Sequence, residues 1–248
     1  RVLYLVANGF ATPDQILGLT FTRKAAGELS VRIRKRLRQL SQLPEFKHIT
    51  STSTAVTTYH SYAGKLLSEH AIRFGIDADS QPMGEAALWM AANTLVRDWN
   101  DPDFVYEGAL NTAIDDVMGL ASLILEHQVS LDSIRAADEK TLGELALFTG
   151  ASNEEVRTAA RTARQRIALL PLVERFIETR RGEGTLSFDD QMSLAADIAI
   201  KFPDVAAIER GKYAVVLLDE YQDTSQSQVR LLSALFGNGH PVTAVGDP

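Results

Sequence analysis

The sequence predicts an α/β protein, in which a parallel-sheet domain is interrupted by an all-helical insertion. Short apolar runs, of the length of buried strands, occur near both ends of the chain, and each ends in polar residues. Between them, across residues 84–181, apolar residues recur at helical spacing with almost no strand-like alternation. We expect residues 1–70 and 183–248 to form the sheet domain and residues 71–182 to form the helical insertion.

The first strand and helix are expected directly after a turn. The segment 12–15, sequence TPDQ, has the cap, proline and glutamine of a helix or turn start. Residues 16–21 form a short apolar run that suits a buried strand. Thr22 can then cap a helix that runs to about Leu40. The apolar residues that share one face of this helix are Leu29, Ile33, Leu37 and Leu40.

A second strand and a series of helices follow. Residues 53–58 are rich in β-branched side chains and lead into the segment 59–62, where another helix is expected. Three apolar stripes then predict the helices of the insertion, and Pro171 should kink or split the third of them. The stripes are Leu88, Ala92, Leu95 and Trp99; Leu110, Ile114, Val117, Ala121 and Ile124; and Val156, Ala160, Ala163, Ile167 and Leu170.

The C-terminal part returns to strands. The segment 182–184, sequence GEG, breaks the last inserted helix, and residues 186–190 begin another. Residues 213–218 form an unbroken apolar run, as strands in the middle of a parallel sheet do. After one more helix, residues 241–245 predict another buried strand, which ends in the segment 246–248, sequence GDP.

Composition restricts the class of protein. Of 248 residues, 45% are hydrophobic and 23% are charged, as in ordinary soluble globular proteins. We expect no membrane-spanning segment and no secretory signal, because no apolar run has the necessary length or flanks. The chain has no cysteine, which excludes disulfides, a thiolate nucleophile and thiolate metal sites, and fits a reducing, cytoplasmic location.

Positive charge is concentrated in one segment of an acidic chain. The net charge is −7, but residues 23–38 hold seven cations and a single acid, Glu28. Nucleic-acid binding depends on such local patches rather than on global charge. Two interpretations stay open for this helix: it contacts DNA, or its charges are only solvated.

Two acids, Asp219 and Glu220, come directly after the strand predicted at 213–218. In parallel sheets, ligands gather at the carboxyl ends of strands. One carboxylate there can hold Mg²⁺ against nucleotide phosphates, and its neighbour can orient and deprotonate the attacking water. The alternative is that both acids only cap the helix that follows.

Five segments carry motif-like sequences in a fixed order. They are residues 19–26 (LTFTRKAA), 57–62 (TTYHSY), 187–190 (SFDD), 217–224 (LLDEYQDT) and 242–248 (VTAVGDP). In this order they resemble motif Ia, the TFHSF segment, the DFDDL segment, motif II and the start of motif III of UvrD/Rep/PcrA-type superfamily 1 DNA helicases. The resemblance covers essentially the whole chain and implies a RecA-like fold of the P-loop NTPase type. The run 239–248 also resembles actinobacterial RecB-like helicase–nucleases.

The resemblance implies a nucleotide site on motif II, with ATP and Mg²⁺ as cofactors. Asp219 is implied as the Mg²⁺ ligand and Glu220 as the catalytic base for ATP hydrolysis. Gln222 and Asp223 are implied to couple this site to motif III and to DNA, with Gln222 taking part in catalysis. Asp219, Glu220 and Asp247 are the implied nucleotide-binding residues.

The resemblance also implies a groove for single-stranded DNA. Phe21 is implied to stack on a base of any identity. The residues implied to line the same groove and contact phosphates are Thr22, Arg23, Lys24, Thr58, Tyr59 and His60. Arg23 stands where the family usually has asparagine, a cationic change that keeps phosphate binding. The alternative for His60 is a buried histidine that caps a helix, and Asp189 and Asp190 are expected to act structurally, in helix capping and inter-domain hydrogen bonds.

One family motif does not occur in this sequence. The phosphate loop, GxxxxGK[ST], has no match. In the family it directly precedes the segment that residues 1–3 resemble, and motif III continues beyond the segment that ends at 248. We therefore expect a fragment of the first motor domain, without the second RecA-like domain, that alone hydrolyses ATP negligibly.

The resemblance implies a parent protein that translocates on single-stranded DNA, 3′ to 5′, and unwinds duplexes in repair or recombination. Its implied partners are single-stranded and partly duplex DNA and a repair protein or second motor subunit, with no membrane. Two alternatives stay open. One is a non-hydrolysing single-stranded-DNA-binding or scaffold subunit with a degenerate motor, and the other is a different P-loop NTPase whose motif II matches by chance.

Overall fold

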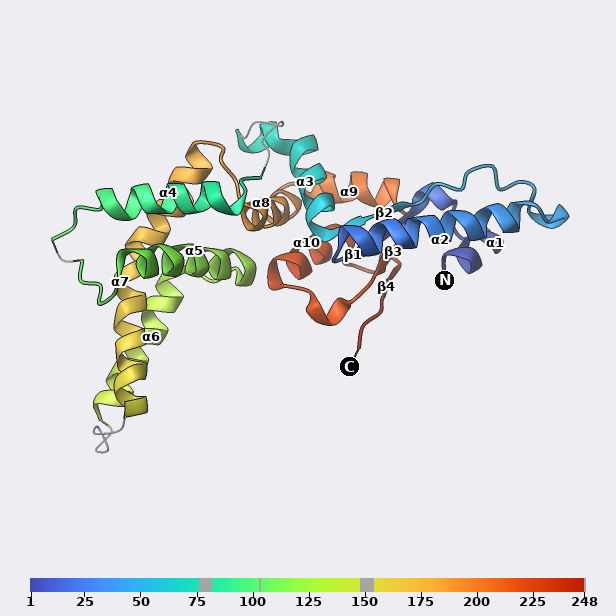
Figure 1. The fold of residues 1–248 in the computed structure, drawn as a ribbon. Coiled ribbons are helices and arrows are strands. Elements are labelled where there is room, and N and C mark those ends of the chain that lie inside the picture. Colours follow the sequence, from blue (N-terminus) through green and yellow to red (C-terminus); the bar gives the residue numbers. More distant parts are fainter. Residues whose placement is uncertain (76–81, 103, 148–153, 248) are drawn as a thin grey trace. The chain divides into compact units, whose positions relative to one another are not determined.

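The computed structural model of the chain describes residues 1–75, 82–102, 104–147 and 154–247, and it has two compact units (Figure 1). One unit combines Arg1–Ala78 with Gln191–Pro248, and the other is Asp79–Asp190. Both boundaries lie eight residues later in the chain than the expected limits at 70/71 and 182/183. The first unit contains the sheet, and the second is made of helices.

The sheet has four strands, all parallel, in the order β2-β1-β3-β4. The strands are β1 (Ile16–Thr20), β2 (Ala55–Thr58), β3 (Val215–Leu218) and β4 (Val242–Ala244). This confirms the predicted α/β class with a parallel sheet. β1 and β3 lie in the middle, with Ile16 opposite Val215 and Leu19 opposite Leu218. Because all four strands run the same way, their carboxyl ends meet at one edge.

The last strand differs from its prediction as a buried strand. Val242 is 41% exposed and Val245, just beyond β4, is 61% exposed. β4 pairs with β3 on one side and has no second neighbour within the part of the chain that the structure describes. An apolar run therefore predicted a strand correctly but not its burial, since burial depends on what covers the strand.

Helices surround the sheet within the first unit. Those that lie wholly in it are α1 (Val2–Ala7), α2 (Arg23–Ser41), α3 (Tyr59–His70), α9 (Pro203–Lys212) and α10 (Gln226–Phe236). The short 3-10 helices are η1 (Pro13–Gln15), η2 (Pro44–Phe46), η3 (Ala71–Phe74) and η4 (Tyr221–Asp223). The hydroxyl of Thr22 accepts a hydrogen bond from the backbone N–H of Ala25 at 3.1 Å, which confirms the predicted cap of α2.

Each face of the sheet is covered by apolar side chains. On one face, Ile16 and Val215 pack with Val2 and Leu5 of α1 and with Leu37 of α2. Leu37 is the buried centre of the apolar stripe predicted for α2. Leu17, Leu19 and Val216 have the opposite orientation, because side chains alternate along a strand, and all three are buried.

The helical unit has a core of its own. Its helices are α4 (Glu85–Asp98), α5 (Leu110–His127), α6 (Leu131–Ala146) and α7 (Glu154–Gly182), and α8 (Phe188–Lys201) begins in it. Ala92, Ile114, Val117 and Phe176 are among the buried residues at its centre. Of the two outcomes predicted for Pro171, a kink or a split, the split does not occur, because α7 runs unbroken through it. Neighbouring buried residues such as Leu172 hold the helix in the core on both sides of the proline.

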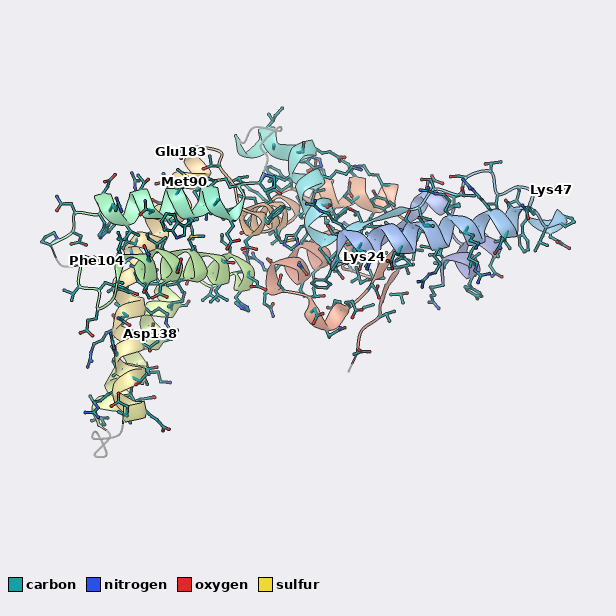
Figure 2. The ribbon with its side chains drawn as sticks, in the orientation of Figure 1. Lys24, Lys47, Met90, Phe104, Asp138 and Glu183 are labelled. Carbon is teal, nitrogen blue, oxygen red and sulfur yellow. The ribbon has the colours of Figure 1, made fainter. Side chains whose placement is uncertain are left out.

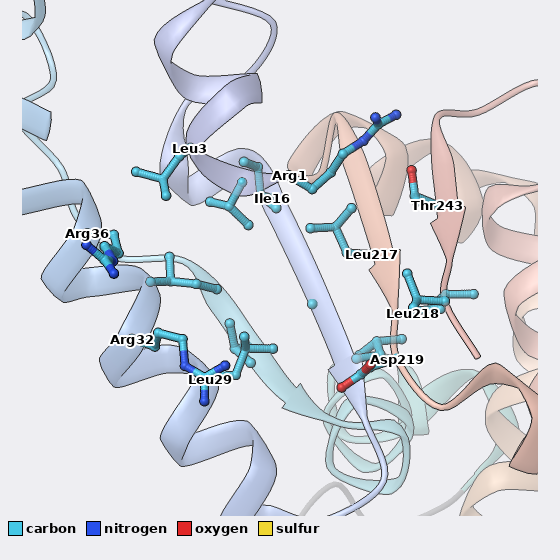
Figure 3. Close-up of a pocket in the computed structure, with 16 residues that line it drawn as sticks. Arg1, Leu3, Ile16, Leu29, Arg32, Arg36, Leu217, Leu218, Asp219 and Thr243 are labelled. Carbon is cyan, nitrogen blue, oxygen red and sulfur yellow. The ribbon is translucent and has the colours of Figure 1, made fainter. Parts of the chain in front are cut away.

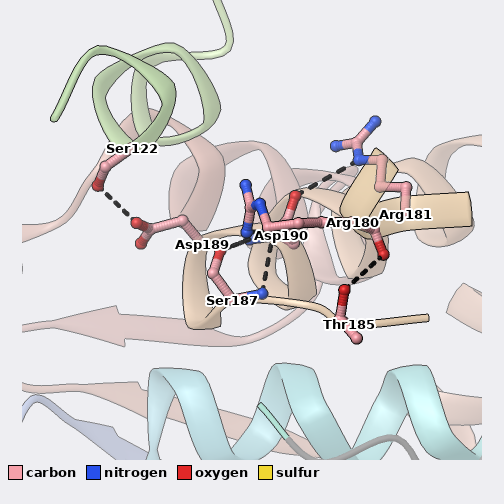
Figure 4. A network of polar contacts seen from close by, with 7 residues as sticks. All are labelled: Ser122, Arg180, Arg181, Thr185, Ser187, Asp189 and Asp190. Carbon is pink, nitrogen blue, oxygen red and sulfur yellow. Dashed lines mark hydrogen bonds and ion pairs between the residues drawn. The ribbon is translucent and has the colours of Figure 1, made fainter. Parts of the chain in front are cut away.

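A network of polar side chains joins α5 and α7 to the start of α8 in the helical unit (Figure 4). Arg180 donates to the carboxylate of Asp190, and both side chains are almost wholly buried. Ser187 caps α8 by accepting from the N–H of Asp190 at 3.0 Å, and the Asp190 carboxylate accepts from the N–H of Ser187 at 3.0 Å. Ser122 of α5 donates to Asp189 at 2.6 Å. These bonds agree with the structural role expected for both acids, and all of them lie within the helical unit.

No helix in the described part of the chain is long and apolar enough to cross a membrane.

Candidate functional site

The carboxyl edge of the sheet gathers the segments that the sequence singled out. Phe21 follows β1, Tyr59 follows β2, Asp219 follows β3 and Gly246 comes shortly after β4. These segments are far apart in the sequence but adjacent in the sheet. Ligands bind at this edge in open α/β sheets. The structure therefore brings the predicted nucleotide residues and the predicted DNA residues to one side of one unit.

Asp219 is half-buried at the end of β3. Its N–H donates to the carbonyl of Leu19 at 3.0 Å, which fixes the backbone at that point. Its carboxylate makes no hydrogen bond or ion pair with the residues that the structure describes, so both oxygens are available to a ligand. Asp219 lines a cavity of about 570 Å³ over the sheet, together with Arg32 and Arg36 of α2 (Figure 3).

Glu220 is exposed and has an unusual backbone. Its φ is 53° and its ψ is 43°, the left-handed conformation that costs most residues free energy and that glycine adopts readily. Its carboxylate accepts a hydrogen bond from the side-chain amide of Gln222 at 2.7 Å. The side-chain carbonyl oxygen of Gln222 accepts a hydrogen bond from the backbone N–H of Asp247 at 3.1 Å. Three predicted site residues are thus joined in a single chain of hydrogen bonds.

Gly246 makes this arrangement possible, and the sequence interpretation gave it no role. A Cβ at this position would clash with Oε1 of Gln222 and would lie 3.1 Å and 3.2 Å from the backbone nitrogens of Gln222 and Tyr221. The N–H of Tyr221 donates to the carbonyl of Val245 at 2.9 Å, so the two loops cannot move apart without breaking that bond. The available signal was a glycine directly after a predicted strand, which often marks a close approach of backbones.

The residues after β1 are open to solvent. Phe21 is half-buried, and Thr22, Arg23 and Lys24 are exposed at the start of α2, where Figure 2 labels Lys24. The cations of the basic segment are all exposed, and none forms an ion pair with a carboxylate that the structure describes. They are Arg23, Lys24, Arg32, Arg34, Lys35, Arg36 and Arg38. The surface of α2 therefore presents unneutralised positive charge next to Phe21.

Two of the three residues that the family resemblance implied at the end of β2 are buried. Thr58 is buried and caps α3 by accepting from the N–H of Ser61 at 3.1 Å, so His60 is not the cap. Tyr59 is only 3% exposed. His60 is half-buried in the first turn of α3. The chain itself covers Thr58 and Tyr59, so of these three residues His60 is the most accessible, and contact of any of them with DNA stays a prediction.

Tyr59, although buried, contacts a residue of the predicted DNA site, Phe21, and a residue of the predicted nucleotide site, Asp219. Its ring lies against that of Phe21, with centroids 5.0 Å apart and planes tilted by 52°. Its hydroxyl donates to the backbone carbonyl of Asp219 at 3.3 Å. Burial raises the pKa of Tyr59 above its ordinary value, so the hydroxyl stays protonated and remains a donor at neutral pH.

The donors at this edge fit a magnesium ion held partly by a nucleotide. The described residues contain no group of three or more His, Asp or Glu side chains that could hold a metal by themselves. Mg²⁺ in nucleotide sites usually takes one or two carboxylates and completes its shell with phosphates and water. Asp219, with two uncommitted oxygens and an adjacent exposed Glu220, offers that kind of partial donor set.

The fold and this edge define the class of α/β domains that bind ligands at the carboxyl ends of a parallel sheet. Over residues 1–248 the sequence matches the family described as UvrD/REP helicase N-terminal domain. The chain belongs to that family, and its α/β fold is RecA-like, as the sequence predicted.

The individual relatives share less than a third of their residues with this chain. The chain is 29% identical to the ATP-dependent DNA helicase UvrD2 of Mycobacterium tuberculosis, over 100% of this chain and 31% of that protein. It is 25% identical to the ATP-dependent DNA helicase UvrD1 of Mycobacterium leprae, over 96% of this chain and 26% of that protein. It is also 25% identical to the DNA helicase II of Rickettsia typhi, over 100% of this chain and 32% of that protein. The chain thus spans about a third or less of the length of these relatives.

Proposed function

We propose that this chain is part of the first motor domain of an ATP-dependent DNA helicase that moves 3′ to 5′ on single-stranded DNA and separates duplexes in repair or recombination. The observation that carries the proposal is the hydrogen-bonded chain Glu220–Gln222–Asp247 beside Asp219, at the same sheet edge as Phe21. The names of the relatives support it, because several of them are ATP-dependent DNA helicases. In this proposal residues 1–70 and 183–248 belong to the motor domain, and 71–182 are its helical insertion.

The nucleotide chemistry is assigned to the end of β3. Asp219 binds Mg²⁺, which neutralises charge on the phosphates of ATP. Glu220 accepts the proton of the attacking water, and its exposure leaves room for that water. Gln222 holds the Glu220 carboxylate in place and links it to the backbone of Asp247. A change at the nucleotide site therefore changes the position of the loop after β4.

Single-stranded DNA is assigned to the residues after β1. Phe21 stacks on a base, which gives affinity without sequence choice. Arg23 and Lys24 contact phosphates, and His60 lies at the start of the neighbouring helix. The cations further along α2 extend this contact to the sugar–phosphate backbone beyond the stacked base. The proposed partners of the complete protein are single-stranded and partly duplex DNA, with a repair protein or a second motor subunit.

ATP hydrolysis by the full-length protein tests the assignment, because the chain covers a minor part of its relatives. Hydrolysis is measured with and without a single-stranded oligonucleotide, for the wild type and for Glu220→Gln. We expect DNA to stimulate the wild type, and Glu220→Gln to lower the stimulated rate by about 100-fold or more. Affinity for single-stranded DNA should be unchanged in that variant. Single-stranded DNA binding without any hydrolysis in the wild type would instead favour the non-hydrolysing DNA-binding subunit.

The basic face of α2 has a separate test. Replacing Arg34, Lys35 and Arg38 with glutamine should weaken single-stranded DNA binding and flatten its salt dependence, by about 0.7 in the log–log slope for each lost phosphate contact. Arg157→Gln is the control, because Arg157 is an exposed cation on α7 that already pairs with Glu154. An unchanged slope in the triple variant would show that the face is only solvated.

A further inference from the structure

One buried side chain lies between the two proposed sites. Tyr59 is 3% exposed, its ring contacts Phe21, and its hydroxyl reaches the backbone carbonyl of Asp219. It cannot stack on DNA itself, and it is not one of the carboxylates that would touch a nucleotide. Its position requires another explanation, since a buried phenol that only filled space would not need a hydroxyl.

We propose that Tyr59 is a positioning residue that couples DNA binding at Phe21 to the nucleotide site at Asp219 and Glu220. The inference rests on the proposed function, because it names a regulation of that same site. The hydroxyl is the chemical difference that matters, because the family segment that 57–62 resembles has phenylalanine where this chain has Tyr59. The proposed coupling therefore depends on the hydroxyl oxygen of Tyr59.

The hydroxyl holds the peptide that leads into Glu220. The Asp219 carbonyl, which accepts from Tyr59, belongs to the peptide bond between Asp219 and Glu220. On its other side, the N–H of Asp219 is fixed by the carbonyl of Leu19. Glu220 follows in the left-handed conformation, which persists only when its surroundings impose it. The bond from Tyr59 is one of those constraints, so its loss lets the carboxylate of Glu220 leave its position.

The ring of Tyr59 connects this constraint to Phe21. The backbone of Tyr59 is anchored, because Thr58 caps α3 immediately before it. The Tyr59 side chain can therefore respond mainly by turning against the Phe21 ring, 5.0 Å away. A base that stacks on Phe21 restricts that ring and, through it, the direction of the Tyr59 hydroxyl. Equilibrium coupling of this kind must be reciprocal, so a nucleotide bound at Asp219 should also change the affinity for DNA.

The decisive variant is Tyr59→Phe in the full-length protein, which keeps the ring and removes one oxygen. We expect its affinity for a single-stranded oligonucleotide, measured alone by fluorescence anisotropy, to stay within about twofold of the wild type, because Phe21 and the cations are untouched. The DNA-stimulated kcat for ATP should fall about three- to tenfold, the range expected for one lost hydrogen bond, with KM little changed.

Binding at equilibrium gives a readout that does not depend on turnover. The affinity for the oligonucleotide is measured with and without Mg²⁺ and a non-hydrolysable ATP analogue. In the wild type the analogue should shift that affinity, and in Tyr59→Phe the shift should shrink or disappear. A role in packing alone would leave this shift unchanged.

Tyr62→Phe is the matched control. Tyr62 lies on the same helix, is equally buried, and donates its hydroxyl to Glu209 at 2.7 Å, away from the site. It should affect stability without changing DNA stimulation or the effect of the analogue. If Tyr62→Phe lowers stimulation as much as Tyr59→Phe does, general loosening of α3 explains both, and the proposal is overturned.

Phe21→Leu tests the same route from the DNA side, in a protein that keeps Tyr59. Phe21→Leu leaves the Tyr59 hydroxyl in place and should lose both DNA affinity and coupling. The double variant should then lose no more coupling than Phe21→Leu alone, whereas additive losses would contradict a shared route. Full stimulation and a full analogue effect in Tyr59→Phe overturn this inference and leave the proposed function intact. Absence of any DNA-stimulated hydrolysis in the wild type overturns the proposed function instead.

Discussion

Two acidic pairs in this chain have the same chemistry and opposite surroundings. Asp189 and Asp190 lie at the start of α8 in the helical unit, where Asp190 is 0% exposed and paired with buried Arg180. Asp219 and Glu220 lie at the end of β3, where Asp219 is half-buried and Glu220 is exposed. Neither forms an ion pair with a cation among the described residues. A buried acid with a fixed cation holds a structure together. An accessible acid on a strained backbone, without a counter-charge, is available for chemistry.

The largest effect should come from the buried pair. Asp190→Asn removes the charge that compensates Arg180, whose pKa burial already lowers. We expect the free energy of unfolding to fall by about 3–5 kcal/mol, as when one partner of a buried ion pair is removed. Urea denaturation measures it. Asp189→Asn should cost less than about 1 kcal/mol, since its amide oxygen can still accept from Ser122. Equal losses would mean that burial does not distinguish the two acids.

The close approach at Gly246 should give the next largest effect. Gly246→Ala forces the added methyl group against Gln222 and the backbone of Tyr221. We expect a loss of about 1–3 kcal/mol by urea denaturation, as for overpacked sites. DNA-stimulated hydrolysis should fall with it, because Gln222 holds Glu220. Gly143→Ala, on α6 with open space around it, should instead stabilise by about 0.5–1 kcal/mol.

The strained backbone of Glu220 predicts a gain in stability. Glu220→Gly relieves the left-handed conformation at φ 53° and removes the carboxylate. We expect the free energy of unfolding to rise by up to about 1 kcal/mol, because glycine adopts this conformation without strain. DNA-stimulated ATP hydrolysis should be abolished in the same variant. A destabilised Glu220→Gly would show that the hydrogen bond from Gln222 outweighs the strain, and that this acid is also structural.

The smallest effect concerns His240, a half-buried residue that has no charged partner among the described residues. Burial lowers the pKa of His240 below its ordinary value, and its Nε2 has no hydrogen-bond partner among the described residues. The unfolded chain therefore binds more protons than the folded one just below pH 6.5, so stability falls as pH drops through that range. His240→Gln should reduce the loss of unfolding free energy between pH 7 and 5. An identical pH profile in the variant would place the acid sensitivity elsewhere.

The sequence predicted the elements well because each carries a local signal. The stripe on α2, the cap at Thr22 and the apolar run before Asp219 each depend on a few neighbouring residues. Burial was harder, as Val242 shows, because exposure depends on what covers a strand rather than on its own residues. Pro171 likewise sits inside an unbroken helix, since packing on both sides of the proline outweighs the lost hydrogen bond.

For the candidate site, the motifs named residues that the structure brings together, but they did not indicate the contacts between them. The order of the motifs identified Asp219, Glu220, Gln222 and Asp247, and the structure places them at one edge. The motifs did not indicate that Tyr59 would be buried, because a residue between a strand and a helix can point either way. The need for glycine at 246 arises from a loop more than twenty residues earlier in the chain, which no local pattern contains.

The pairing of β1 with β3 also has a consequence for how the protein is made. Ile16 lies opposite Val215, so the ribosome must synthesise the whole helical unit before β1 can pair with β3, although β2 is already available to it. The helices of that unit follow one another along the chain and surround their own core, so they can fold while translation continues. The sheet, and with it the edge where the acids and Phe21 meet, assembles last. Until then β1 can pair only with β2 and its other edge is open, and this is the stage at which the nascent chain is most exposed to aggregation.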